Sequence, residues 1–133
     1  MSNAFAQPGP VEQYLQYLAQ GQFKLQRSRR SGEYIYYPSA FGTQGASNEL
    51  DWVDVSGRGT VYSVTTVRRP AKHGGDYNTS IVQLDEGPRM LTRVLGIEPD
   101  AITIGMKVSA RIEKPLWDPE ATQPLVVFYP LTT

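Results

Sequence analysis

The chain has 133 residues, 40% of them apolar and 20% charged, which is ordinary globular composition and enough length to bury one core. Its 13 basic and 13 acidic residues cancel, which argues against a general binder of nucleic acids or membrane surfaces, because such proteins carry a basic excess. No run approaches the roughly 18 to 20 apolar residues of a membrane span, and the first residues lack the pattern of a signal peptide. We therefore expect a cytoplasmic protein with no membrane partner.

An amphipathic helix is predicted over residues 10–20. Pro10 suits the first helical position, and Gly21 is a typical stop. Apolar side chains then recur at the spacing of one helix face, at Val11, Tyr14, Leu15 and Leu18. A lone helix of about ten residues is unstable in water, so we expect this face to dock either on the chain's own core or on a partner protein.

Residues 22–52 follow as short strands around turns. The alternating residues Phe23, Leu25 and Arg27 predict a first strand. The aromatic residues 34–37 then form a strand-prone run that Pro38 ends. Leu50, Trp52 and Val53 restore the apolar character. This region is predicted to be a small subdomain of its own.

Two pairs of small residues in this subdomain have the spacing of zinc-ribbon ligands. They are Ser28 and Ser31, and Gly42 and Gly45. With cysteine at these four places the stretch would be two C-x-x-C knuckles, but the chain contains no cysteine. A serine hydroxyl stays protonated and glycine has no side chain, so we expect a ribbon without zinc. The aromatic and apolar residues Tyr34, Ile35, Tyr36, Tyr37, Phe41 and Trp52 are expected to replace the metal as its core.

The rest of the chain reads as five strands. They are predicted at residues 59–67, 80–84, 89–95, 107–113 and 125–129, and the turn sequence 85–88 joins the second to the third. Five strands suggest a small closed barrel of the OB type rather than a sandwich. The predicted organisation is thus a tail and helix (1–21), a degenerate ribbon (22–52) and a mainly β OB-fold domain (53–133).

This order of elements resembles a known family, the OB-fold domain proteins with a rubredoxin-like zinc ribbon, an acyl-CoA-associated family of unknown function. The resemblance covers about residues 11–130 and is sharpest over 50–63 and 84–89. In the family the four ribbon cysteines would fall on Ser28, Ser31, Gly42 and Gly45, where this sequence departs from the pattern. We therefore do not expect this chain to bind the zinc ion of the family.

The resemblance implies a non-catalytic accessory or scaffold subunit that partners a thiolase-like or related acyl-CoA enzyme and helps to handle acyl-CoA thioesters. A free-standing module that binds an acyl-CoA ligand is the alternative, with no tightly bound cofactor in either case. An enzyme comes last, because the residues form no recognisable nucleophile and base. The one histidine, His73, lies in a polar loop.

Two loops are expected to flank the binding face of the barrel, at residues 68–78 and 115–124. Arg68, Arg69 and Lys72 in the first loop suit the phosphates of coenzyme A, although loop cations are often simply solvated, and His73 is a further candidate contact. In the second loop Leu116 and Trp117 either pack over the barrel end or anchor a partner.

A second basic cluster lies at the first vacated knuckle and consists of Arg27, Arg29 and Arg30. The tyrosines of residues 34–37 follow it closely, and arginines interleaved with aromatic residues can bind single-stranded nucleic acid. The balanced charge makes nucleic acid an unlikely ligand. We expect the ribbon, with these arginines and the helix, to contact a partner protein.

Overall fold

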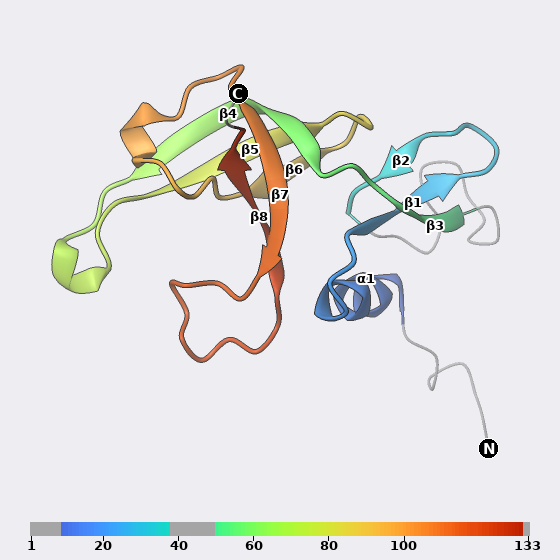
Figure 1. The fold of residues 1–133 in the computed structure, drawn as a ribbon, viewed down its shortest axis with the longest axis horizontal. Coiled ribbons are helices and arrows are strands. Elements are labelled where there is room, and N and C mark those ends of the chain that lie inside the picture. Colours follow the sequence, from blue (N-terminus) through green and yellow to red (C-terminus); the bar gives the residue numbers. More distant parts are fainter. Residues whose placement is uncertain (1–8, 38–49, 132–133) are drawn as a thin grey trace.

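A computed structural model describes residues 9–37 and 50–131 (Figure 1). It has one α-helix, two short 3-10 helices and eight strands within these residues. In chain order the elements are α1 (Pro10–Ala19), β1 (Lys24–Ser28), β2 (Tyr34–Ile35), β3 (Leu50–Asp54), β4 (Arg58–Val67), η3 (Ala71–His73), β5 (Tyr77–Leu84), β6 (Arg89–Thr92), η4 (Pro99–Ala101), β7 (Lys107–Glu113) and β8 (Leu125–Pro130).

Five strands form an antiparallel sheet in the order β6-β5-β4-β7-β8. The two edges meet, because the chain just after β6 pairs with β8 in parallel through a bridge between Val94 and Phe128. Backbone N–H groups donate in both directions there, from Leu95 to Phe128 at 2.7 Å and from Phe128 to Arg93 at 3.1 Å. The sheet therefore closes into a five-stranded barrel, as the sequence predicts.

Glycine lets the strands of this barrel approach one another closely. Gly59 is buried in β4, and a Cβ atom there would lie 2.6 Å from a methyl of Val82 and 2.8 Å from the carbonyl oxygen of Gln83. At Gly59, β4 pairs with both β5 and β7. A β-bulge between Val61 and Ser63 then shifts the register of β4 against β5, and such bulges bend a strand around a barrel.

The helix and a smaller sheet pack on one side of the barrel (Figure 1). This sheet has the order β2-β1-β3 and is antiparallel throughout. Tyr14 and Leu18 of α1 are 4% and 1% exposed and join Leu25 of β1 and Phe128 of β8 in one apolar core. Of the two predicted docking partners for the helix, the structure shows the chain's own core.

Aromatic contacts fasten α1 to the smaller sheet. The indole N–H of Trp52 on β3 donates to the Gln13 side chain at 2.6 Å, and the Trp52 and Tyr17 rings lie 5.3 Å apart between their centres. Tyr14 packs edge-on against Tyr36 at 6.0 Å. Ile35 is buried, and Tyr34, Tyr36 and Trp52 are partly buried against the core, whereas Tyr37, which was also expected in the core, is 51% exposed.

Several predicted boundaries need correction. The second barrel strand starts at Tyr77 rather than at residue 80, so Asn78, predicted to lie in a loop, is a buried strand residue. The third strand ends at Thr92 rather than at residue 95, because the chain there leaves β5 and turns to β8. Only the first two of the residues 34–37 are a strand, and β3 runs from Leu50 to Asp54. Phe41, Gly42 and Gly45 lie outside the described residues.

None of the helices in the described part of the chain is both long and apolar enough to pass through a membrane.

Candidate functional site

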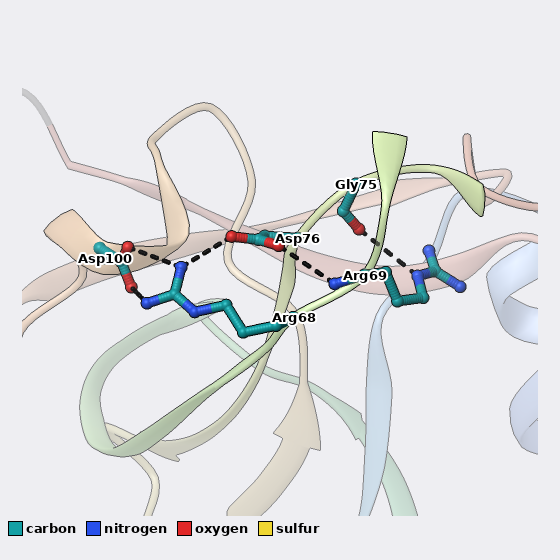
Figure 2. A network of polar contacts seen from close by, with 5 residues as sticks. All are labelled: Arg68, Arg69, Gly75, Asp76 and Asp100. Carbon is teal, nitrogen blue, oxygen red and sulfur yellow. Dashed lines mark hydrogen bonds and ion pairs between the residues drawn. The ribbon is translucent and has the colours of Figure 1, made fainter. Parts of the chain in front are cut away.

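The loop between β4 and β5 is held by ion pairs of Arg68 (Figure 2). Its guanidinium donates to Asp76 at 2.7 Å and to both oxygens of Asp100 in η4 at 2.9 and 3.0 Å. Asp76 also accepts the backbone N–H of Arg69 at 3.1 Å. Hydrogen bonds from Arg68 hold the pKa of both carboxyls below the ordinary value of 3.8. Arg68 therefore already satisfies two carboxylates, which would compete with any phosphate.

A row of stacked side chains connects this loop to the loop between β7 and β8. The guanidinium carbon of Arg93, just after β6, lies 4.1 Å from the ring centre of Tyr77 and 3.9 Å from that of Trp117. Arg69 lies 4.5 Å from the Tyr77 ring. We call Arg69, Tyr77, Arg93 and Trp117 the cation–π row. Two of its members, Arg69 and Trp117, were predicted as site residues, and the structure brings them together through the other two.

Beside the cation–π row lies an open groove of about 370 Å³. It runs between α1 and the barrel, and its lining comes from α1, the tyrosines after β2, strands β6 and β8, and Trp117. The lining residues that the argument below uses are Leu15, Tyr37, Leu91, Arg93, Trp117 and Leu125. Four of them are large side chains that remain well exposed, Tyr37, Leu91, Trp117 and Leu125. Exposed apolar side chains gathered around a groove are typical of binding sites.

The polar groups in this groove differ in charge. Burial raises the pKa of Tyr14 well above the ordinary value of 10.0, and Tyr36 and Tyr37 raise it further, so its hydroxyl stays neutral. Burial lowers the pKa of Arg93, with Tyr77 raising it and Arg69 lowering it, but an arginine remains protonated in proteins. Within the described residues, Arg93 is the one charged side chain that lines the groove.

Lys72 and His73 lie exposed in η3, in the loop between β4 and β5. The serine nearest in sequence to this loop, Ser80, is 1% exposed and its hydroxyl donates to Asn78 in the core at 2.7 Å. His73 at the surface and Ser80 in the interior therefore do not form a nucleophile and base.

The first knuckle of the predicted ribbon is a turn closed by Ser28. Its hydroxyl oxygen is buried and accepts the backbone N–H groups of Arg30 and Ser31, each at 3.2 Å. The Ser31 hydroxyl accepts the N–H of Glu33 at 3.2 Å. Both hydroxyls thus serve the turn itself, and neither supplies the thiolate that a zinc ribbon requires, so these two residues do not fit a zinc site. In the described residues, no three His, Cys, Asp or Glu side chains gather as metal ligands.

The ribbon arginines have partners within the smaller sheet. Arg27 donates to the carbonyl oxygen of Gly32 at 3.1 Å and packs on the ring of Tyr34, 5.2 Å from its centre. Arg29 forms an ion pair with Asp51 on β3 at 3.2 Å. Arg30 is exposed in the same turn. These arginines lie on the smaller sheet, and the structure does not join them to the cation–π row.

Tyr77 and Arg93 are the site residues that sequence reasoning missed. Tyr77 was assigned to a loop, and Arg93 to the middle of a strand. Only the closure of the barrel brings the end of β6 beside the loop that carries Trp117, so no local pattern marked Arg93.

Comparisons with known proteins agree with this fold. Residues 52–113 match the model of the ChsH2 C-terminal OB-fold domain. The chain is 38% identical over 84 residues to a probable enoyl-CoA hydratase alpha subunit of Thermomonospora curvata, covering 59% of this chain and 25% of that protein. It is 35% identical over 65 residues to a DUF35 domain-containing scaffold protein of Pyrococcus furiosus, covering 47% of this chain and 48% of that protein. The chain thus spans a quarter to a half of these relatives.

A solved structure matches nearly the whole chain. The Ltp2-ChsH2(DUF35) aldolase is similar with a TM-score of 0.76 and 29% identity, over 94% of this chain and 97% of that one. The similarity therefore includes α1 and the smaller sheet as well as the barrel. Residues 52–113 are thus similar to the ChsH2 C-terminal OB-fold domain, and the chain shares the fold of the Ltp2-ChsH2(DUF35) aldolase over 94% of its length.

Proposed function

We propose that this protein is a non-catalytic accessory subunit that assembles with an enzyme acting on acyl-CoA thioesters, of the thiolase-like class that the family resemblance implies. The observation that carries the proposal is the match to the DUF35 chain of an Ltp2-ChsH2 assembly over 94% of this chain. The scaffold name of the archaeal relative supports the same role.

The positions of the polar side chains favour an accessory role over catalysis. His73 is exposed at the surface, and the Ser80 hydroxyl is committed to Asn78 in the core. The hydratase relative does not weigh against this, because the chain corresponds to only 25% of that subunit. The name of that relative describes the whole hydratase subunit, not only the part that this chain matches.

The loop between β7 and β8 supplies the proposed partner contact. Leu116 is 81% exposed and Trp117 beside it is 38% exposed. The ring of Trp117 also contacts the guanidinium of Arg93. An exposed leucine next to a tryptophan held in place suits an interface anchor, because little conformational freedom remains to be lost on binding. Lys72 and His73 in η3 are proposed as further polar contacts.

Co-purification from the native source tests this function. The tagged chain is predicted to retain an acyl-CoA enzyme, identified by mass spectrometry and by its turnover of an acyl-CoA ester. Leu116→Asp places a charge at the proposed contact and is predicted to lower the captured enzyme at least about tenfold.

Ile104→Asp is the matched control, because Ile104 is also exposed, at 71%, but does not line the groove or lie in this loop. It is predicted to leave capture unchanged. Equal loss with both variants would refute the assigned surface. Absence of any acyl-CoA enzyme with the wild-type chain would refute the function.

A further inference from the structure

The groove beside the cation–π row has the lining of a small-molecule site. Its volume of about 370 Å³ falls within the roughly 300 to 1,000 Å³ of known ligand pockets. Apolar side chains line it from several elements, among them Leu15 of α1, Leu91 of β6 and Leu125 of β8. Such a lining favours an apolar chain.

Arg93 supplies the positive charge of the groove. Arg93 lines the groove, and no ion pair of Arg93 with a carboxylate is formed within residues 9–37 and 50–131. This sets Arg93 apart from Arg68, which satisfies two carboxylates, and from Arg29, which pairs with Asp51. A half-buried guanidinium without a carboxylate favours an anionic ligand.

The position of this guanidinium is fixed before a ligand arrives. The guanidinium carbon lies over the rings of Tyr77 and Trp117, at 4.1 and 3.9 Å from their centres. Cation–π contacts do not use the guanidinium N–H groups as donors to an oxygen, and these groups can bind two oxygens of a carboxylate or phosphate at once. An immobilised donor also loses less conformational freedom on binding.

We propose that this groove binds a small amphipathic anion, with the apolar chain between α1 and β8 and a carboxylate or phosphate on Arg93. The site lies within this chain and does not depend on a partner enzyme. It differs from the predicted phosphate contact at Arg68 in both residue and position.

Calorimetry on the isolated full chain tests the proposal with three probes of equal chain length: octanoate, octyl phosphate and 1-octanol. At least one of the anions is predicted to bind at least about tenfold more tightly than the alcohol, since a charge-assisted pair is at stake. Preference between octanoate and octyl phosphate then identifies the anionic group. Equal affinity for the alcohol, or no binding of either anion, would overturn the proposal.

Arg93→Met removes the charge while keeping a long apolar side chain in the row. It is predicted to weaken binding of the preferred anion at least about tenfold and to leave that of octanol unchanged. Arg111→Met is the matched control, because Arg111 also packs on a ring, 4.1 Å from the centre of Tyr129, but does not line this groove. Anion binding that survives in Arg93→Met would overturn the proposal, and the comparison of probes on the wild-type chain tests it even if this variant fails to fold.

Discussion

Asn78 fastens the closing edge of the barrel. Its amide group donates to the carbonyl oxygen of Val94 at 2.8 Å and accepts the Val94 N–H at 3.0 Å, while Ser80 donates to the same amide oxygen at 2.7 Å. All three residues are at most 3% exposed. Val94 is the residue that bridges to β8, so one buried side chain satisfies the backbone where β6 leaves β5. Sequence reasoning placed Asn78 in a loop, because asparagine is rare in strands and its partner is 16 residues away.

Asn78→Ala is predicted to lower the free energy of unfolding by about 2 to 4 kcal/mol, since it leaves buried donors and acceptors without partners. Urea denaturation followed by circular dichroism measures this. Ser80→Ala removes only one donor and is predicted to cost about 1 kcal/mol. A smaller effect for Asn78→Ala than for Ser80→Ala would contradict the role given to the amide.

Arg68 is predicted to make the loop 68–76 sensitive to acid. The pKa values of Asp76 and Asp100 lie below 3.8 in the folded chain, so their ion pairs are fully present above that pH. They are lost as the pH falls through the lower folded values. In an NMR titration, the amide signal of Arg69, which reports on Asp76, is predicted to move with a midpoint below 3.8.

Arg68→Met is the control for this titration and should raise the midpoint toward the ordinary value of 3.8, although the Arg69 N–H still donates to Asp76. Both carboxylates are exposed, so added salt should shift the midpoint of the wild-type chain in the same direction. A midpoint in the wild-type chain at or above 3.8 would show that the ion pairs do not form in solution.

Among the elements, the helix is the one whose packing partner the sequence left undecided. The recurrence of Tyr14 and Leu18 predicted both the helix and its buried face, and the structure confirms both, with α1 ending at Ala19 before Gly21. The neighbouring sequence did not indicate which residues pack against this face. The core residue Phe128 is more than 100 positions away, and the hydrogen bond from Trp52 to Gln13 spans 39 residues.

Leu18→Ala is predicted to lower the free energy of unfolding by about 2 to 5 kcal/mol, because Leu18 is 1% exposed in the shared core. The barrel and the smaller sheet are predicted to unfold in one transition, since α1 packs in the same core as both. Gln16→Ala, on the exposed face of the same helix, should change stability by less than about 0.5 kcal/mol. Two separate thermal transitions in the wild-type chain would contradict the single core.

The strands of the barrel, like the helix, were predictable because local sequence patterns mark them. Alternation and turn residues located all five, and the predicted hairpin through residues 85–88 is present, with Gln83 paired to Arg89 and Val82 to Met90. Their ends were less predictable, because they depend on barrel closure. The groove and the cation–π row belong to this unpredictable part, as their residues come from α1, β5, the end of β6 and the loop after β7.

For the whole molecule, the central question is what holds the smaller sheet in place in a chain that contains no cysteine to bind zinc. Ser28 closes the first knuckle by its own hydrogen bonds, and Trp52 and Tyr36 attach the sheet to α1. Packing and hydrogen bonds thus supply the order that a metal supplies in a zinc ribbon. The overall similarity to a DUF35 chain extends over this part of the molecule too.

Purified protein is therefore predicted to contain less than about 0.1 zinc per chain, and a chelator should leave its melting temperature unchanged, since a structural zinc ion contributes roughly 10 kcal/mol or more where it is needed. Elemental analysis and thermal denaturation with and without EDTA measure both. One zinc per chain, or a fall in melting temperature on chelation, would contradict the vacated ribbon.

The most direct test of the accessory role is activity reconstitution with the co-purified acyl-CoA enzyme. Size-exclusion chromatography with light scattering should show a complex heavier than the 14.8 kDa chain, and acyl-CoA turnover should belong to the partner, with none detectable for this chain alone. A chain that turns over acyl-CoA without a partner, or that stays at 14.8 kDa when mixed with the enzyme, would contradict the account.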